Sequence, residues 1–254
     1  MNIKCQGIII RRFDLGEADR ILTIFTERLG KIKAIAKGVR KISSKLAGNL
    51  EPFNVIGLEL HQGKTFYTVT GAVILESFSS DKKSELSDFS RFNYLSELID
   101  KLFEENDRHE RAFELFVKTI EYISSKSDSS HNTDLILRIF ELKILEESGF
   151  KPEIYNCLHC KKNLKPSENF WDKIEGGIIC AKCQGQYHHG KKISDEVIKL
   201  FRLIEKNDID LAYKLKMRRI FEIEAETILN EYILSILEQN LKSREFLKLV
   251  ERRN

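Results

Sequence analysis

The sequence predicts an α+β protein, in which a small β-barrel precedes a helical part, and three observations predict it. Residues 2–78 contain short runs of β-branched and aromatic side chains separated by turn residues. From about residue 80 the apolar residues recur at helical spacing. Two Cys-x-x-Cys pairs then interrupt the helical pattern. We therefore expect a barrel domain at 1–79 and an all-α domain at 80–254, with a four-cysteine, zinc ribbon-like insertion at 153–192.

Five runs in the first part are expected to be strands. They read IIIRRF, RILTIFT, GKIKAIAKGV, NVIGLELHQ and TFYTVTGAVIL. Between the third and fourth runs lies RKISSKLAGNLEPF, which is long enough for a short helix and a loop. Five short strands with an interruption after the third are the order of an OB-fold barrel.

The helical part contains several amphipathic segments. Helical spacing of apolar residues predicts helices within 87–103, 109–123 and 134–149, with a polar loop at 124–133. Gly149 and Pro152 are the stop signals of the third helix. Further amphipathic helices are expected within 194–206, 218–239 and 243–253.

The composition is that of a globular protein without a membrane segment. The 254 residues are 42% apolar and 32% charged. No apolar run approaches the roughly 18 residues that span a bilayer, and the start MNIKCQGIII lacks the features of a secretory signal. Four of the five cysteines have metal-like spacing, which suits a reducing compartment better than a disulfide framework. We expect a cytoplasmic protein.

Charge is distributed unevenly along the chain. Residues 1–80 hold 12 Lys and Arg against 7 Asp and Glu, whereas residues 81–150 hold 10 against 16. A basic block followed by an acidic block indicates separate domains with different partners.

The cysteines have the spacing Cys-x2-Cys-x19-Cys-x2-Cys, which is typical of zinc ribbons. Each knuckle directs two sulfurs at one point, and two knuckles complete a tetrahedron. Four protein ligands leave no open position for a water molecule, so the pattern indicates a structural zinc ion and not a catalytic one. Buried thiols or two disulfides are the alternatives. The expected ligands are Cys157, Cys160, Cys180 and Cys183.

Residues 28–45 form a basic run without any acidic residue. If 30–37 is a strand, its lysines share one face with Ile35, while Ile32, Ala34 and Ala36 face the barrel interior. A row of cations on a sheet face suits a nucleic-acid backbone, although a solvated charged face is the alternative. Phe13, Phe66 and Tyr67 are candidate stacking platforms. The expected DNA-binding residues are Arg28, Lys31, Lys33, Lys37, Arg40, Lys41 and Lys45, extended by Arg11 and Arg12.

Enzymatic motifs are weak in this chain. Glu17 and Asp19 are the best candidates for catalytic acids of a nucleic-acid-modifying or hydrolytic enzyme, but an acidic turn between two strands explains them more simply. A structural adaptor that uses the acidic block is a third alternative.

Several short motifs follow one another in the first part of the chain. They are the Gly16-Glu17-x-Asp19 turn, Thr26, Gly30-Lys31, Lys37-Gly38, Ser44 and Leu50-x-Pro52-Phe53. RFNYLSELIDKLF, RIFELKILEESGFKP and the paired cysteines come after them. In this order, the motifs resemble the RecO family of DNA repair proteins.

The resemblance implies an N-terminal OB-fold, helical middle and C-terminal parts, and a zinc-stabilised insertion. It also implies a recombination mediator that is not an enzyme, needs no nucleotide hydrolysis and acts on DNA in the nucleoid. Such a protein binds single- and double-stranded DNA and anneals complementary strands. It works with RecR and the single-stranded-DNA-binding protein to help load the RecA recombinase.

Overall fold

A computed structural model of the chain describes residues 2–78, 85–125, 130–187, 190–211 and 215–252. The chain forms two compact units. The first contains Met1–Ser125 and Leu241–Asn254, and the second contains Lys126–Asn240. The barrel thus shares a unit with helices from the middle and the end of the chain. The division at 79 and 80 into two domains remains a prediction.

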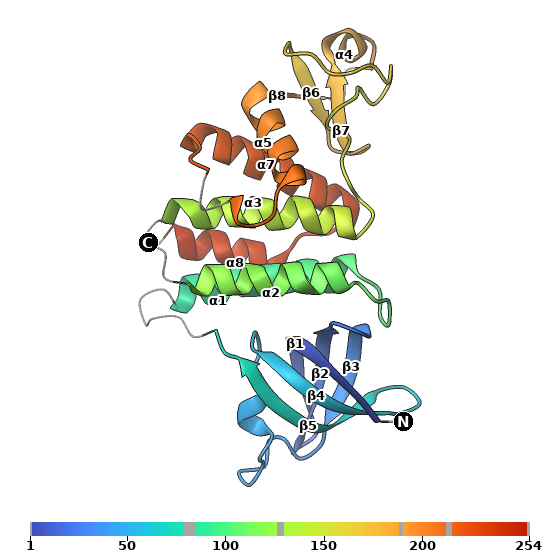
Figure 1. The fold of residues 1–254 in the computed structure, drawn as a ribbon, viewed down its shortest axis with the longest axis vertical. Helices are drawn as coiled ribbons and strands as arrows, with labels where there is room; N and C mark the ends of the chain where they lie inside the picture. Colours follow the sequence, from blue (N-terminus) through green and yellow to red (C-terminus); the bar gives the residue numbers. More distant parts are fainter. Residues whose placement is uncertain (1, 79–84, 126–129, 188–189, 212–214, 253–254) are drawn as a thin grey trace. The chain divides into compact units, whose positions relative to one another are not determined.

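The first unit begins with five strands that form a closed barrel in the order β1-β2-β3-β5-β4 (Figure 1). The pairings β1 with β2, β2 with β3, β1 with β4 and β4 with β5 are antiparallel. A short parallel pairing of β3 with β5 closes the barrel. A 3₁₀ turn, η1, lies between β3 and β4, where the sequence predicts a short helix. This arrangement confirms the predicted OB-fold barrel. The strands are β1 (Asn2–Leu15), β2 (Asp19–Thr26), β3 (Gly30–Ala36), β4 (Val55–Gln62) and β5 (Tyr67–Glu76), and η1 is Ala47–Asn49.

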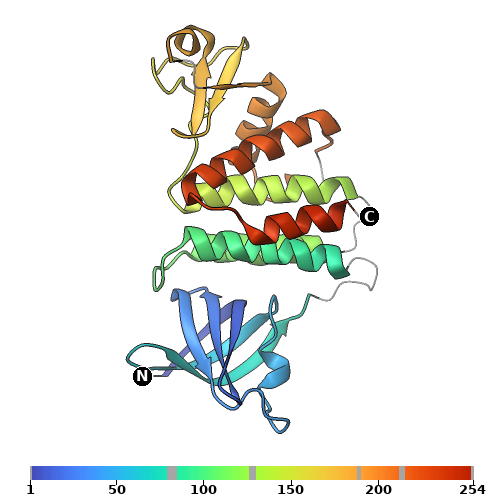
Figure 2. The ribbon, with the colours of Figure 1, turned by 180° about the vertical axis from the view of Figure 1, so that it is seen from behind.

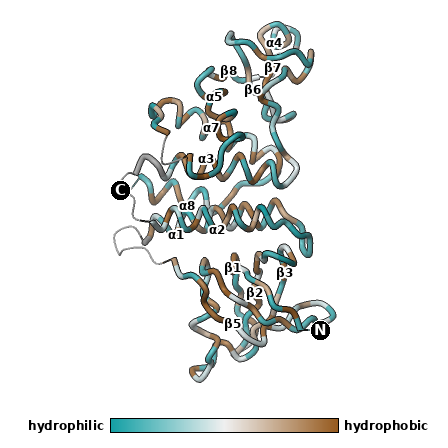
Figure 3. The backbone as a smooth tube through the Cα atoms, in the orientation of Figure 1, coloured by the Kyte–Doolittle hydropathy of each residue, from teal (hydrophilic) through white to brown (hydrophobic). Residues whose placement is uncertain are grey.

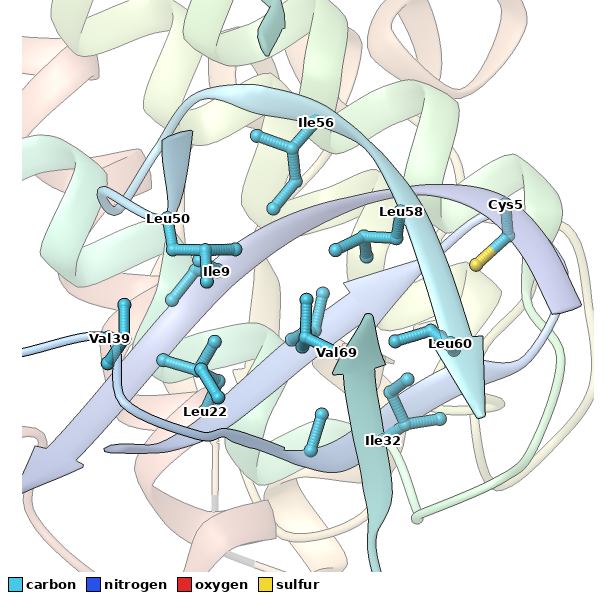
Figure 4. Packing of buried hydrophobic residues seen from close by; sticks show 13 residues of the cluster. Cys5, Ile9, Leu22, Ile32, Val39, Leu50, Ile56, Leu58, Leu60 and Val69 are labelled. Atoms are coloured by element: carbon cyan, nitrogen blue, oxygen red, sulfur yellow. The ribbon is translucent and has the colours of Figure 1, made fainter. Parts of the chain in front are cut away.

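The barrel interior is filled by aliphatic side chains from all five strands (Figure 4). Ile32, Ala34 and Ala36 of β3 are fully buried there, as the alternating pattern predicts. The pairing of β1 with β2 contains a β-bulge between Ile9 and Arg11. A bulge adds one residue to one strand, so it reverses which side chains of β1 face inward beyond this point.

Three helices complete the first unit and lie side by side in both views (Figures 1 and 2). Phe25 of β2 projects away from the barrel interior and contacts Phe103, Phe113 and Phe116, with ring centroids 5.6–6.4 Å apart. Arg244 donates a hydrogen bond to the Tyr94 hydroxyl, so the last helix packs on the first. The helices are α1 (Glu85–Leu102), α2 (Glu110–Ser124) and α8 (Lys242–Glu251).

The second unit consists of three main helices and a small cysteine-containing element. A three-stranded sheet in the order β7-β6-β8 forms the base of this element. Its central residue, Trp171, packs edge-on against Phe201 and Tyr232, which belong to two of the helices. The helices are α3 (Ser130–Glu147), α5 (Asp195–Lys206) and α7 (Arg219–Leu237), and the small element holds β6 (Asn169–Asp172), β7 (Gly177–Cys180), α4 (Ala181–Tyr187) and β8 (Lys191–Ile193).

Most predicted elements are present, with a few differences at their edges. Helix α3 begins at Ser130, inside the segment expected to be a loop, and neither α4 nor β8 was predicted. Figure 3 shows the helices alternating between hydrophobic and hydrophilic residues along their length, as amphipathic helices do. Of the helices that the structure describes, none combines the length and the apolar character that crossing a bilayer requires.

Candidate metal centre and nucleic-acid interface

The four predicted metal ligands converge in the second unit. The sulfurs of Cys157, Cys160, Cys180 and Cys183 all lie within 4.8 Å of one another, and all five cysteines of the chain carry free thiols. Cys157 and Cys160 flank a tight turn, while Cys180 ends β7 and Cys183 lies in the first turn of α4. The hairpin of β6 and β7 therefore brings two knuckles together from opposite ends of the insertion.

This geometry fits a tetrahedral metal ion. Metal–sulfur distances of about 2.3 Å in a tetrahedron place the sulfurs about 3.8 Å apart, and those of Cys160 and Cys180 are 3.9 Å apart. The Cys180 backbone amide donates a hydrogen bond of 3.4 Å to the Cys157 sulfur, a contact that favours a thiolate. In the part of the chain that the structure describes, no other group of metal-ligating side chains is close enough to hold an ion.

The surroundings of the thiols shift the pKa values of Cys157 and Cys183 in opposite directions. Burial alone would raise the pKa of Cys157, but the amides of Cys180 and Cys160 outweigh it and lower this pKa to about 6. Burial and the surrounding sulfurs raise the pKa of Cys183 to about 12. Four thiolates this close repel one another, and a divalent cation removes that repulsion.

Glu153 orders the turn that precedes the first knuckle. One oxygen of its carboxylate accepts hydrogen bonds from the amides of Tyr155 and Asn156, at 2.8 and 2.9 Å. Burial would raise the pKa of Glu153, but these amide bonds prevail and lower it from its ordinary value of 4.5. The carboxylate thus places the chain for Cys157, one residue further on.

The predicted basic face of β3 is largely occupied by acidic partners. The Lys31 ammonium is buried and donates to the Asp100 backbone carbonyl, and it lies 3.4 Å from the Asp100 carboxylate. Lys33 forms an ion pair of 2.5 Å with Glu105. Asp100 lies in the last turn of α1 and Glu105 follows the helix, so the acidic block of the chain neutralises part of the basic block.

The two arginines of β1 are also paired. Arg11 contacts Asp100 and Arg12 contacts Glu51, both at 2.6 Å. Sequence reasoning missed these acidic partners because they lie 89 and 39 residues away along the chain. Arg28 is exposed in the turn between β2 and β3. That turn lies at the opposite end of these strands from Lys37, so the structure does not group Arg28 with the rest of the run.

The loop after β3 displays the remaining cations. Lys37, Lys41 and Lys45 are exposed, and none of the described residues forms an ion pair with them. Arg40 points back toward the tip of the hairpin formed by β1 and β2. It donates to the Gly16 carbonyl at 2.8 Å and lies 3.4 Å from Asp14. We call residues 37–45 the basic loop.

Asp19 fixes the start of the basic loop. Its carboxylate accepts a hydrogen bond of 2.7 Å from the Gly38 amide, and the Arg40 amide donates to the Ala18 carbonyl at 2.9 Å. Glu17 is exposed, and among the described residues no third ligand joins these two acids to form a metal site. The acidic turn that suggested catalysis therefore holds a loop in place.

A closed OB barrel with a displayed basic loop, followed by helices and a four-cysteine centre, is an arrangement typical of proteins that bind nucleic acids. The first 78 residues match the model described as Recombination protein O N terminal, and residues 84–245 match Recombination protein O C terminal. The chain belongs to the RecO family of DNA repair proteins.

Three relatives show how far the similarity extends, and each is named DNA repair protein RecO. The protein of Dehalococcoides mccartyi is 35% identical over 100% of this chain and 98% of its own length. The Alkaliphilus metalliredigens protein is 34% identical, covering 98% of this chain and 100% of its own. That of Halalkalibacterium halodurans is 32% identical, covering 98% and 95%.

Proposed function

We propose that this protein is a DNA repair and recombination mediator that works without catalysis. It binds single- and double-stranded DNA, anneals complementary strands and helps to load the RecA recombinase on DNA coated with single-stranded-DNA-binding protein. RecR and the single-strand binder are its protein partners, and the nucleoid is its place of action. Family membership supports this activity, and the basic loop is the observation in the chain itself that supports it best.

The basic loop suits the phosphate backbone for two reasons. Its three lysines are exposed without acidic partners among the described residues, so DNA phosphates need displace no existing ion pair. Each lysine that meets a phosphate releases condensed counterions, which is a large favourable contribution at low salt. We propose Lys37, Lys41 and Lys45 as the primary contacts. Arg40, Arg11, Arg12, Lys33 and Arg28 are secondary contacts, and Lys31 supports the barrel instead because it is buried and paired.

Annealing follows from the same electrostatics. Two complementary strands repel each other through their phosphates, and a surface that neutralises both raises their local concentration until bases pair. This mechanism uses no nucleotide and no active-site acid. The engaged carboxylate of Asp19 gives the alternative of a DNA-cleaving enzyme no comparable support.

We further propose that the metal is one structural zinc ion held by the four cysteines, since zinc prefers a closed tetrahedral site with sulfur ligands. When bound, the ion supplies the cross-link that joins the two knuckles. The residues of the chain position the thiolates, through the amide of Cys180 and the turn that Glu153 holds.

The decisive test replaces Lys37, Lys41 and Lys45 with Gln. DNA affinity at low salt should fall by more than about tenfold, and the slope of log affinity against log salt should flatten by up to about 0.7–0.9 per lysine. Annealing of strands coated with single-strand binder, without nucleotide, should fall in parallel.

A matched variant replaces the exposed lysines Lys118, Lys242 and Lys248 of α2 and α8, which removes the same charge elsewhere in the first unit. If both triple variants lose affinity equally, the basic loop is not the binding surface. If wild-type protein binds no DNA at low salt, the proposed function itself is wrong.

A further inference from the structure

The outer face of β1, β2 and β3 carries an apolar row bordered by cations. In the strand register, Phe13 pairs with Ile21 and Ile21 with Ile35. The adjacent row contains Arg11, Thr23 and Lys33. Neighbouring strands are about 4.8 Å apart, so the apolar row extends about 10 Å across the sheet. Phe13 is 51% exposed, and Ile21 and Ile35 are half-buried beneath the same surface.

The bulge in β1 is the reason that Phe13 lies on this face. Ile9 fills the barrel interior opposite Ile24. With strict alternation, Arg11 and Phe13 would also point inward. The extra residue between Ile9 and Arg11 reverses the alternation, so Arg11 and Phe13 share the outer side with Thr23 and Ile21. The fold therefore places a large aromatic ring in solvent although an inward register was available to it.

One cation contacts this ring, and two more lie on the same side of the barrel. The Arg11 guanidinium lies over the Phe13 ring, 5.0 Å from its centroid, and is held in place by Asp100. Lys33 of β3 and Lys37, the residue that follows this strand, lie two strands away from Phe13, and both are exposed. An apolar surface alone does not specify its ligand. A flat ring among cations is complementary to a ligand that combines planar apolar faces with negative charge.

We infer that Phe13 is a stacking platform for an unpaired nucleobase of a single strand, with Ile21 and Ile35 as the apolar floor beside it. Single-stranded nucleic acid presents base faces and phosphates together, and stacking on aromatic side chains is tolerant of sequence. In a duplex the base faces are already covered by their neighbours. This inference rests on the proposed DNA binding. It adds to that proposal an aromatic contact that distinguishes single-stranded from double-stranded DNA.

The first measurement compares Phe13→Ala with wild type on a single-stranded oligonucleotide and on the duplex made from it. Affinity for the single strand should fall on the order of tenfold, and that for the duplex by less than about twofold. The salt slope should not change, because no phosphate contact is removed. Val73→Ala is the matched control, since Val73 is 57% exposed on β5 of the same barrel, and it should leave both affinities unchanged.

The second measurement reports stacking directly. Phe13→Trp should restore single-strand affinity, and its indole fluorescence should be quenched by the single strand. The only native tryptophan, Trp171, is buried in the other unit and supplies the background. Val73→Trp should show no added quenching.

Three results would overturn the inference that Phe13 is a stacking platform. These are unchanged affinity in Phe13→Ala, an equal loss for single strand and duplex, or no quenching of Phe13→Trp. In all three the wild-type protein still binds DNA with a steep salt dependence, so the proposed function survives. If the wild-type protein binds neither form of DNA, the proposed function fails and the platform fails with it.

Discussion

At the residue scale, the Asp19 carboxylate joins two segments of the barrel through one hydrogen bond. It accepts a hydrogen bond from the Gly38 amide, at the point where β3 ends and the basic loop begins. A charged acceptor of this kind contributes about 1.5–3 kcal/mol. Asp19 thus fixes the start of the loop that displays Lys37, Lys41 and Lys45.

Replacing Asp19 with Ala should release the start of the basic loop. We expect a loss of about 1–3 kcal/mol in the free energy of unfolding and a several-fold loss of DNA affinity, measured by urea denaturation and by DNA titration. Glu17→Ala removes the same charge two residues away from an exposed position and should change neither quantity. A loss of DNA cleavage activity in Glu17→Ala would instead revive the enzyme alternative.

Gly30 is a second residue whose type is dictated by the structure. Its φ is +65°, and a Cβ there would lie 1.7 Å from the Asp107 carbonyl oxygen. The loop after α1 approaches β3 this closely because the Asn106 amide donates to the Lys31 carbonyl.

Gly30→Ala should therefore destabilise the protein by at least about 2 kcal/mol, from left-handed backbone strain together with overpacking. Chemical denaturation measures this loss. Gly48→Ala is the control, because a Cβ at Gly48 meets nothing within 4 Å. Equal stabilities of the two variants would show that the loop does not pack on Gly30 in solution.

At the scale of elements, the two cysteine knuckles share a small apolar cluster. Its buried members are Cys157, Ile179 and Cys183, and partly buried residues surround them. The rest of the insertion is better packed, since Trp171 is buried against Phe201 and Tyr232. A cluster this small does not hold the two knuckles together, and a metal cross-link would supply what is missing.

Purified protein should contain one zinc ion per chain, and Cys160→Ser should lose it together with the ordered structure of β6 and β7. Metal analysis and amide hydrogen exchange measure the two effects. Cys5→Ala is the matched control, since Cys5 lies in the barrel core and outside the cluster. Its pKa is raised by burial to about 11, so it remains a thiol at neutral pH. Full zinc content in Cys160→Ser would contradict a four-thiolate site.

At the scale of the whole molecule, opposite charges from distant parts of the chain meet within the first unit. The acidic residues at the end of α1 pair with Arg11, Lys31 and Lys33 of the barrel. In the proposed function, these pairs compete with DNA for the same cations. The acidic block therefore limits how much of the basic surface is available.

Glu105→Gln should release Lys33, whose pair with Glu105 is about half exposed. We expect DNA affinity at low salt to rise severalfold and the salt slope to steepen by up to about 0.7–0.9. Glu104→Gln makes the same change in net charge at the neighbouring exposed position. Equal gains in both variants would indicate a general charge effect and not the release of Lys33.

The sequence by itself determined the features that depend on local pattern. Alternation and turn residues predict the five strands, helical spacing predicts the main helices, and the spacing of the cysteines predicts the metal ligands. Each of these is encoded within a few tens of residues. For the metal centre, two knuckles at the ends of one short hairpin already predict that the four sulfurs converge.

Only the tertiary structure decided which cations remain available and which aromatic ring faces solvent. Lys31 and Lys45 look alike in the sequence, but one is buried against Asp100 and the other is exposed. One added residue in β1 moved Phe13 from the inner to the outer face, and α8 packs on α1 from the far end of the chain. Pairing of charges and packing of faces depend on residues far apart in sequence, and only folding brings those residues together.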